Sequence, residues 1–259
     1  MEALPTVILG FLAGLWLAPL VEAYLPGFVA VLLLVPLAII LMAALWSQLP
    51  TQIKSKVNDG RAALLLIPVV LAVGWFSFEI SPWVEQVVFD GDARRFITNE
   101  LGVTFDQRNS LVVGIAMGFA VIPTIFSIAE DAVFSVPKHL SNGSLALGAT
   151  PWQTLTKVVL LTASPGIFSA VMMGLGRAVG ETMIVLMATG NTPIMDWNIF
   201  EGMRTLSANI AVEMPESEVG SSHYRILFLA AFVLFIFTFF FNTIAEFVRQ
   251  RLRDKYSSM

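Results

Sequence analysis

The stretch Gly174-Leu175-Gly176-Arg177-Ala178-Val179-Gly180-Glu181-Thr182-Met183 places two charges near the end of a long apolar run. A charged side chain at the centre of a membrane-spanning helix costs about 2.5–3.5 kcal/mol on insertion scales. Arg177 and Glu181 are one helical turn apart, so a continuous helix would put them on one face and let them pair. A planar guanidinium also binds anions through two hydrogen bonds. The run therefore predicts a membrane helix with a functional pair of charges.

The composition indicates an integral membrane protein of helical type. Of the 259 residues, 56% are hydrophobic and only 13% are charged, whereas soluble domains carry about 25% charged residues. The absence of cysteine excludes disulfides, thiolate nucleophiles and cysteine metal sites. No G-x-x-x-x-G-K-[ST] sequence occurs, so we expect no ATP site in the chain itself.

Six uncharged apolar runs have about the 20 residues that a helix needs to cross a bilayer. The predicted spans are residues 3–21, 26–46, 62–78, 110–129, 158–176 and 226–245. Prolines and glycines interrupt the first run, which predicts a broken or short helix there. The fifth run is predicted to continue through Arg177 and Glu181 to about Thr189.

The charges of the connecting segments predict the orientation of the chain. Nine of the fifteen Lys and Arg residues lie in segments 47–61, 130–157 and 246–259, and twelve acidic residues lie in segments 22–25, 79–109 and 190–225. The positive-inside rule puts the first set in the cytoplasm. We therefore expect both termini to be cytoplasmic.

The loop 130–157 contains signals for two short helices. Pro137 can start the first helix in its first turn, and Gly148 can end it. Thr150 can cap a second helix that begins with Pro151. The loop is thus predicted to form a helix–glycine–helix hairpin at the membrane surface.

These segments carry a specific resemblance. Ser144-Leu-Ala-Leu-Gly-Ala-Thr-Pro-Trp, followed by Lys157-Val-Val-Leu-Leu, resembles the EAA loop of ABC importer permeases. The stretch from Gly174, with Gly190-Asn191-Thr192 after it, resembles more narrowly the phosphate importer permeases of the PstC and PstA type. Two departures are Asn142-Gly143-Ser144 in place of Glu-Ala-Ala, and Leu160-Leu161 in place of Leu-Pro, which predicts the loss of a helix kink.

Near the start, Pro5-Thr6 with Gly10 resembles an element inside a mid-chain helix of these permeases. The chain therefore looks like the C-terminal portion of a longer permease. The resemblance implies an all-α fold of about six transmembrane helices in all, in which a MetI-like permease core carries an extra helix pair, spans 26–46 and 62–78.

The resulting prediction divides the chain into four parts. N-terminal transmembrane helices with the added hairpin (1–80) precede an external loop (81–109), a permease core (110–247) and a basic cytoplasmic tail (248–259). The core contains the cytoplasmic coupling loop 130–157 and an external loop 191–222, in which we expect a short amphipathic helix.

The resemblance also implies functional residues and partners. The coupling helix would dock into a separate ATPase dimer, which alone binds ATP, through Leu145, Leu147, Gly148, Ala149 and Trp152. Other implied partners are a second permease subunit, identical or different, a periplasmic phosphate-binding protein and the lipid of the bacterial inner membrane.

The charged stretch would then belong to the substrate path. We expect Arg177, Glu181 and Thr182 to line that path toward the outer end of the helix, with Glu181 holding the guanidinium when the path is empty. Gly174, Gly176 and Gly180 would allow close approach of helices or substrate. A purely structural role of the pair stays open at this point.

Several other functions also stay open. The chain can be a permease for another oxyanion or solute, an ATP-independent anion channel or carrier, or an inactive fragment. A membrane enzyme would need a carboxylate, Ser/His or metal cluster at one depth, and none is visible. His139 and His223 are predicted on opposite sides of the membrane, so we expect no metal site, and the net charge of −4 does not indicate nucleic-acid binding.

Overall fold

The computed structural model describes residues 5–48 and 64–257. The predicted cytoplasmic charges Lys54, Lys56 and Arg61 lie outside these described residues. Within them, all regular structure is helical, and six helical segments are long and apolar enough to cross a membrane. These are Thr6–Ala23, Leu25–Trp46, Leu66–Asn99, Ser110–Phe134, Pro151–Gly180 and Ser222–Asp254. The predicted all-α membrane fold with six spans is confirmed.

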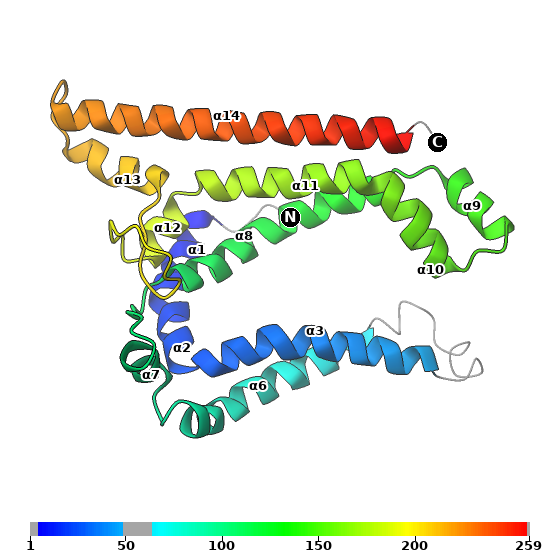
Figure 1. Ribbon diagram of the computed structural model, residues 1–259, viewed down its shortest axis with the longest axis horizontal. Helices are drawn as coiled ribbons and strands as arrows, with labels where there is room; N and C mark the ends of the chain where they lie inside the picture. The colour runs from blue at the N-terminus through cyan, green and yellow to red at the C-terminus, as the bar shows by residue number, and fades with distance from the viewer. Residues whose placement is uncertain (1–4, 49–63, 258–259) are drawn as a thin grey trace. The chain divides into compact units, whose positions relative to one another are not determined.

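The chain forms two compact units, and the first comprises Trp16–Gln107. Its main feature is a hairpin of α3 (Leu25–Gln48) and α6 (Leu66–Val88), drawn in blue and cyan in Figure 1. The two helices approach closely where side chains are small: the backbone N–H of Gly27 donates to Ser81 Oγ at 3.0 Å. The ring of Phe78 packs edge-on against Phe28, with 5.2 Å between ring centres.

Polar contacts join the other elements of this unit. Glu22, in α2 (Ala18–Ala23), accepts hydrogen bonds from Arg94 at 2.5 Å and from Gln107 at 2.6 Å. Arg94 belongs to α7 (Ala93–Asn99), which begins after a capping side chain, Asp92. Because α6 continues to Val88, the first part of the predicted loop 81–109 is helical.

The second unit comprises Met1–Leu15 and Arg108–Met259. Its longest helices are α8 (Ser110–Phe134), α11 (Leu160–Gly180) and α14 (Ser222–Ser257). Helix α11 packs against both α8 and α14, as Figure 1 shows. The first predicted span is broken as expected, since α1 (Thr6–Leu12) passes into a π-helical turn, η1 (Ala13–Leu17).

The loop between α8 and α11 forms the predicted hairpin. Helix α9 (Lys138–Ala146) is closed by Gly148, two residues beyond its end, which has a φ of +88°. The N–H groups of Gly148 and Ala149 bond back to carbonyls of the last turn. Helix α10 (Pro151–Thr154) begins with a capping box in which Thr150 and Gln153 bond to each other's backbone. The pair of short helices is therefore confirmed in its local detail.

Two irregularities differ from the sequence prediction. A π-helical turn, η2 (Leu155–Val159), lies within the start of the predicted span 158–176, whereas Leu160-Leu161 lie in the regular helix α11. The continuous helix predicted to Thr189 is also wrong, because α11 ends at Gly180 and Glu181 is extended, with φ −69° and ψ 127°. A short helix, α12 (Met183–Ala188), follows the break.

The segment after α12 contains the short helix that we expected in the loop 191–222. Helix α13 (Leu206–Glu213) begins after the capping side chain of Thr205 and passes into a 3-10 turn, η3 (Met214–Glu216). Helix α13 contacts both α12 and α14.

A break beside a membrane-embedded arginine

The break after Gly180 separates the two charges that the sequence places on one face. Residues four apart meet only on a continuous helix, and the extended backbone of Glu181 ends that geometry. In the described part of the chain, no hydrogen bond or ion pair joins Arg177 to Glu181. Instead, Glu181 Oε1 accepts from the backbone N–H groups of Met183 at 3.2 Å and Ile184 at 3.4 Å. The predicted pair is therefore wrong, and Glu181 caps α12.

Arg177 finds its partner on another helix. Its Nη1 donates to Thr124 Oγ1 at 3.1 Å. Thr124 lies two residues from residue 122, the midpoint of α8, so the half-buried guanidinium lies beside the middle of that helix and not beside its outer end. Thr124 was missed from sequence because a contact across 53 positions leaves no local signal. The only local feature that marks Thr124 in the sequence is its hydroxyl, next to Pro123 in an apolar run.

The three predicted path residues do not form one hydrogen-bonded cluster. Thr182 precedes α12, and its hydroxyl donates only weakly to the carbonyl of Gly180, at 3.4 Å. Arg177 bonds to α8, whereas Glu181 bonds to α12. The three residues lie on either side of or within the helix break: Arg177 precedes it in α11, and Glu181 and Thr182 lie between α11 and α12.

The predicted packing glycines differ in their surroundings. A Cβ added to Gly174 would lie 2.5 Å from Ile125 and 2.9 Å from Val121 of α8. At Gly176 the nearest neighbour is Asn242, at an ordinary 3.8 Å, and at Gly180 no described atom lies within 4 Å. Only Gly174 is therefore required for close helix packing.

Two glycines that the prediction did not include pack α12 tightly. A Cβ on Gly10 would lie 2.8 Å from the carbonyl oxygen of Met183, and one on Gly14 would lie 2.5 Å from that of Met187. The backbone of α1 thus contacts the backbone of α12, and Ile184 and Val185 are buried. The signal that could have found Gly10 was its place in the Pro5-Thr6 element.

The predicted coupling residues lie on the α9–α10 hairpin. Leu147 and Trp152 are 92% and 70% exposed, Leu145 is also exposed, and Ala149 is half-buried. A hydrogen bond of 3.0 Å between the hydroxyls of Ser144 and Thr154 ties α9 to the end of α10. The hairpin therefore exposes large apolar side chains on two short helices that a hydrogen bond holds together, a surface typical of a docking site.

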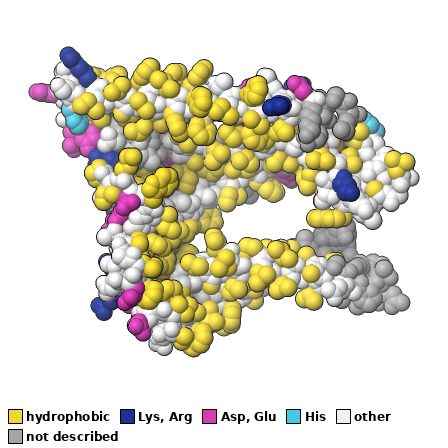
Figure 2. All heavy atoms as spheres, in the orientation of Figure 1, with side chains coloured by type: hydrophobic (Ala, Val, Ile, Leu, Met, Phe, Trp, Pro, Cys, Tyr) yellow, Lys and Arg dark blue, Asp and Glu magenta, His cyan; other side chains and the backbone are white. Residues whose placement is uncertain are grey.

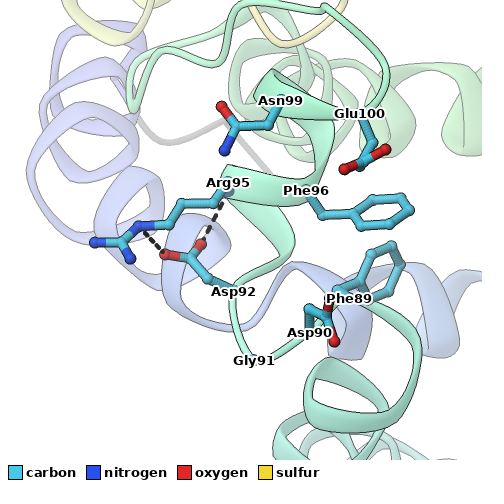
Figure 3. Close-up of a pocket in the computed structure, with 8 residues that line it drawn as sticks. All are labelled: Phe89, Asp90, Gly91, Asp92, Arg95, Phe96, Asn99 and Glu100. Carbon is cyan, nitrogen blue, oxygen red and sulfur yellow. Dashed lines mark hydrogen bonds and ion pairs between the residues drawn. The ribbon is translucent and has the colours of Figure 1, made fainter.

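Each unit contains a pocket. An apolar pocket of 550 Å³ between α11 and α14 is lined by Met172, Val179, Phe237 and Asn242, among others. A polar pocket in the first unit lies at the turn from α6 to α7 (Figure 3).

In the polar pocket, the rings of Phe89 and Phe96 pack edge to face, with 5.4 Å between their centres. Asp92 already pairs with Arg95 at 3.2 Å and caps α7, so its charge is satisfied locally. The two described ranges, 5–48 and 64–257, contain no group of three His, Cys, Asp or Glu residues that could hold a metal ion.

Comparison with known proteins supplies the family. Residues 6–254 match the family described as binding-protein-dependent transport system inner membrane component. No solved structure shows a significant match to the chain.

Curated relatives have the same kind of name. The chain is 38% identical to the probable ABC transporter permease protein YqgH of Bacillus subtilis over 208 residues, which cover 73% of this chain and 67% of that protein. It is 28% identical to the phosphate transport system permease protein PstC of Mesorhizobium japonicum over 246 residues, 91% of this chain and 73% of that one. The phosphate transport system permease protein PstC 1 of Mycobacterium tuberculosis is also 28% identical, over 84% of this chain and 67% of that protein.

The family describes a transport component and not an enzyme, and six apolar helices fit a multi-pass inner membrane protein. The expectation from the EAA-type loop and the charged stretch is thereby confirmed at the level of the family. The chain belongs to the inner membrane components of binding-protein-dependent transport systems, the permease subunits of ABC transporters.

Proposed function

We propose that this permease translocates inorganic phosphate across the bacterial inner membrane, with both of its termini in the cytoplasm. The first support is that several relatives that match most of the chain are named as phosphate transport permeases. The second is the chemistry of Arg177, because a guanidinium fork matches the geometry of phosphate oxygens.

The observation that carries the proposal is that Glu181 does not neutralise Arg177. The guanidinium is held by the neutral hydroxyl of Thr124, and its other N–H groups make no hydrogen bond to the described residues. A charged group at this depth is costly unless it is paired or serves a pathway. An oxyanion that passes the break would supply the missing negative charge and the missing acceptors.

The same break supports a role for Glu181 and Thr182. Glu181 caps the start of α12, four residues along the chain from the arginine, and the Thr182 hydroxyl, between α11 and α12 in the chain, makes only a weak bond. The Glu181 carboxylate can also accept a hydrogen bond from a protonated phosphate oxygen, whereas it would repel a fully ionised anion. These residues would thus favour a protonated oxyanion over one without a proton.

ATP would be bound by separate subunits and coupled through the α9–α10 hairpin. The exposed side chains of Leu147 and Trp152 offer the contact surface, and the left-handed Gly148 sets the turn between the two helices. The complete importer would contain an ATPase dimer, a second permease subunit and a periplasmic phosphate-binding protein. This permease itself would carry no cofactor.

The decisive experiment is phosphate uptake by Arg177→Lys, which keeps the positive charge but loses the fork. The full importer, with its own ATPase, partner permease and binding protein, is reconstituted in liposomes that contain ATP. Since hydrogen bonds to charged groups contribute about 1.5–3 kcal/mol each, we expect at least a roughly tenfold loss of uptake. Arg225→Lys, at an exposed position at the start of α14, is the matched control and should transport normally.

Unchanged phosphate uptake by Arg177→Lys at normal protein level would contradict the proposal. Sulfate, which carries no proton at neutral pH, serves as the competing substrate. Equal uptake of sulfate and phosphate by the unaltered importer would support a general oxyanion permease in its place.

A further inference from the structure

The short helix α12 is tied at its first end to the segment 203–213, which leads into and contains α13. The Ser207 hydroxyl donates to the carbonyl oxygen of Glu181 at 3.1 Å. The Thr205 hydroxyl lies 3.1 Å from the Ser207 hydroxyl and accepts the N–H of Ala208, so the polar chain runs from Thr205 through Ser207 to Glu181. The carbonyl that the break frees from the helical pattern thus gains a partner, and an unpaired carbonyl is costly in a bilayer.

The second end of α12 is tied to the same segment. Arg204 Nε donates to Asn191 Oδ1 at 2.9 Å, and Asn191 has a left-handed backbone with a φ of 58°. The buried Thr189 hydroxyl lies 2.7 Å from the carbonyl oxygen of Met203 and 2.9 Å from that of Val185 in α12, and its single hydrogen is shared between these two acceptors. Just before this segment, a Cβ added to Gly202 would lie only 2.4 Å from the Thr189 carbonyl oxygen. The backbones at Gly202 and Thr189 are therefore in close contact.

Arg204 is itself fixed by other groups. Its Nη1 donates to Glu213 Oε1 at 2.8 Å and to Asn209 Oδ1 at 3.0 Å, and its side chain is only 18% exposed. Glu213 also faces His223 Nε2 at 3.4 Å. The guanidinium therefore cross-links the turn after α12 to the far end of α13.

We propose that Ser207 and Arg204 are positioning residues that fix α12 at both ends and thereby set the geometry of the break at Glu181. The backbone oxygen of Glu181 is bound by Ser207, while its carboxylate caps α12. A movement of α13 must therefore pull on Glu181, the residue at the break that follows α11. The inference rests on the proposed function only in taking the break as part of the substrate path.

The absence of cysteine from the chain provides a direct reporter. Thr182→Cys introduces one thiol in this subunit, at the break, with a side chain of similar size. The assembled transporter is placed in lipid nanodiscs, without phosphate, and the rate at which a water-soluble maleimide labels this subunit is measured. The rate reports how often the break opens to water.

In this background, Ser207→Ala should raise the labelling rate about fivefold, the factor set by loss of one hydrogen bond. Ser207→Thr keeps the hydroxyl and should restore the original rate. Arg204→Lys loses the fork and should raise the rate by a similar factor. Ser217→Ala is the matched control, because the Ser217 hydroxyl donates only to the nearby Met214 carbonyl at 2.9 Å.

A second reporter separates positioning from general loosening of the fold. Asn142→Cys, at an exposed position of α9, should label at the same rate in all of these variants. A rate that rises at both positions would overturn the inference, because it would show that the fold as a whole had loosened. So would an unchanged rate at position 182 in Ser207→Ala and Arg204→Lys.

The labelling result does not depend on which substrate is carried. Faster labelling in Ser207→Ala together with normal phosphate uptake by Arg177→Lys would reject the proposed function and keep the positioning role. Unchanged labelling in Ser207→Ala together with lost uptake by Arg177→Lys would reject the positioning role and keep the proposed function.

Discussion

The α3–α6 hairpin and the α8–α11–α12 region are both apolar, but they use their small and polar residues differently. In the hairpin, α3 exposes most of its large side chains, and Gly74 of α6 has no described neighbour within 4 Å. In the second region, Gly14 and Gly174 admit neighbouring atoms so closely that no Cβ would fit without movement. Figure 2 shows hydrophobic side chains along the hairpin and along α14 alike. Apolar character therefore identifies the spans, whereas contacts tighter than the 3.1 Å found at Gly27 of the hairpin, together with a half-buried charge, distinguish the region around the break.

The largest effect should come from filling a tight contact in one region and an open position in the other. Gly14→Val would drive its Cβ into the Met187 carbonyl, while Gly74→Val adds the same side chain to open space. Overpacking costs about 1–3 kcal/mol, so only Gly14→Val should lower the unfolding temperature in detergent and abolish uptake. Equal unfolding temperatures for the two variants would contradict the claim that the two regions differ in packing.

A second comparison lies within the α9–α10 hairpin. Gly148→Val puts a β-branched residue at a φ of +88°, whereas Gly143→Val changes a helical glycine with no described neighbour within 4 Å. Backbone strain of this kind costs about 1–3 kcal/mol. We expect Gly148→Val to insert normally but to lose ATPase stimulation by the loaded binding protein, and Gly143→Val to keep it. Full stimulation in Gly148→Val would assign the hairpin another role.

A smaller effect should follow from Thr124→Val, which removes the hydroxyl that holds Arg177 and keeps the shape of the side chain. Loss of a hydrogen bond to a charged group is worth about 1.5 kcal/mol or more, which corresponds to roughly tenfold slower phosphate uptake. Thr124→Ser should restore uptake. Thr243→Val is the control, since that hydroxyl bonds only within α14, to the Phe239 carbonyl at 2.8 Å. Uptake lowered equally by both Val variants would show that the effect is not specific to Arg177.

The smallest effect on phosphate uptake is expected in the α3–α6 hairpin. Ser81→Ala leaves the buried N–H of Gly27 without its acceptor, at a cost of about 1–3 kcal/mol. The unfolding temperature should fall slightly while phosphate uptake stays normal. A marked loss of uptake in Ser81→Ala would show that the hairpin takes part in transport and would weaken the contrast between the two regions.

Local patterns in the sequence predicted a large part of this structure. Six spans follow from apolar runs of sufficient length, and the α9–α10 hairpin follows from Gly148, Thr150 and Pro151 at the ends of short helices. These features depend on residues that are neighbours along the chain, so their physical cause is visible in a single stretch. The family, too, was predicted from two such stretches.

Around Arg177, the sequence suggested residues but not the contacts that they make. Spacing alone suggested a pair with Glu181, because it assumed that the helix continues past Gly180. The helix stops there, and the partners of the two charges come from α8 and α12. The contacts of Thr124, Ser207 and Arg204 join residues that are far apart in the sequence, so hydrophobic periodicity cannot predict them.

What the sequence by itself determined is therefore the set of membrane helices, their short connecting hairpin and the presence of a charged residue that is costly in lipid. What only the tertiary structure decided is where that charge finds a partner and where the helix breaks. The physical reason is that insertion depends on the summed hydrophobicity of one segment. A break within a span persists only when other segments supply partners for the freed backbone, as Ser207 does for Glu181.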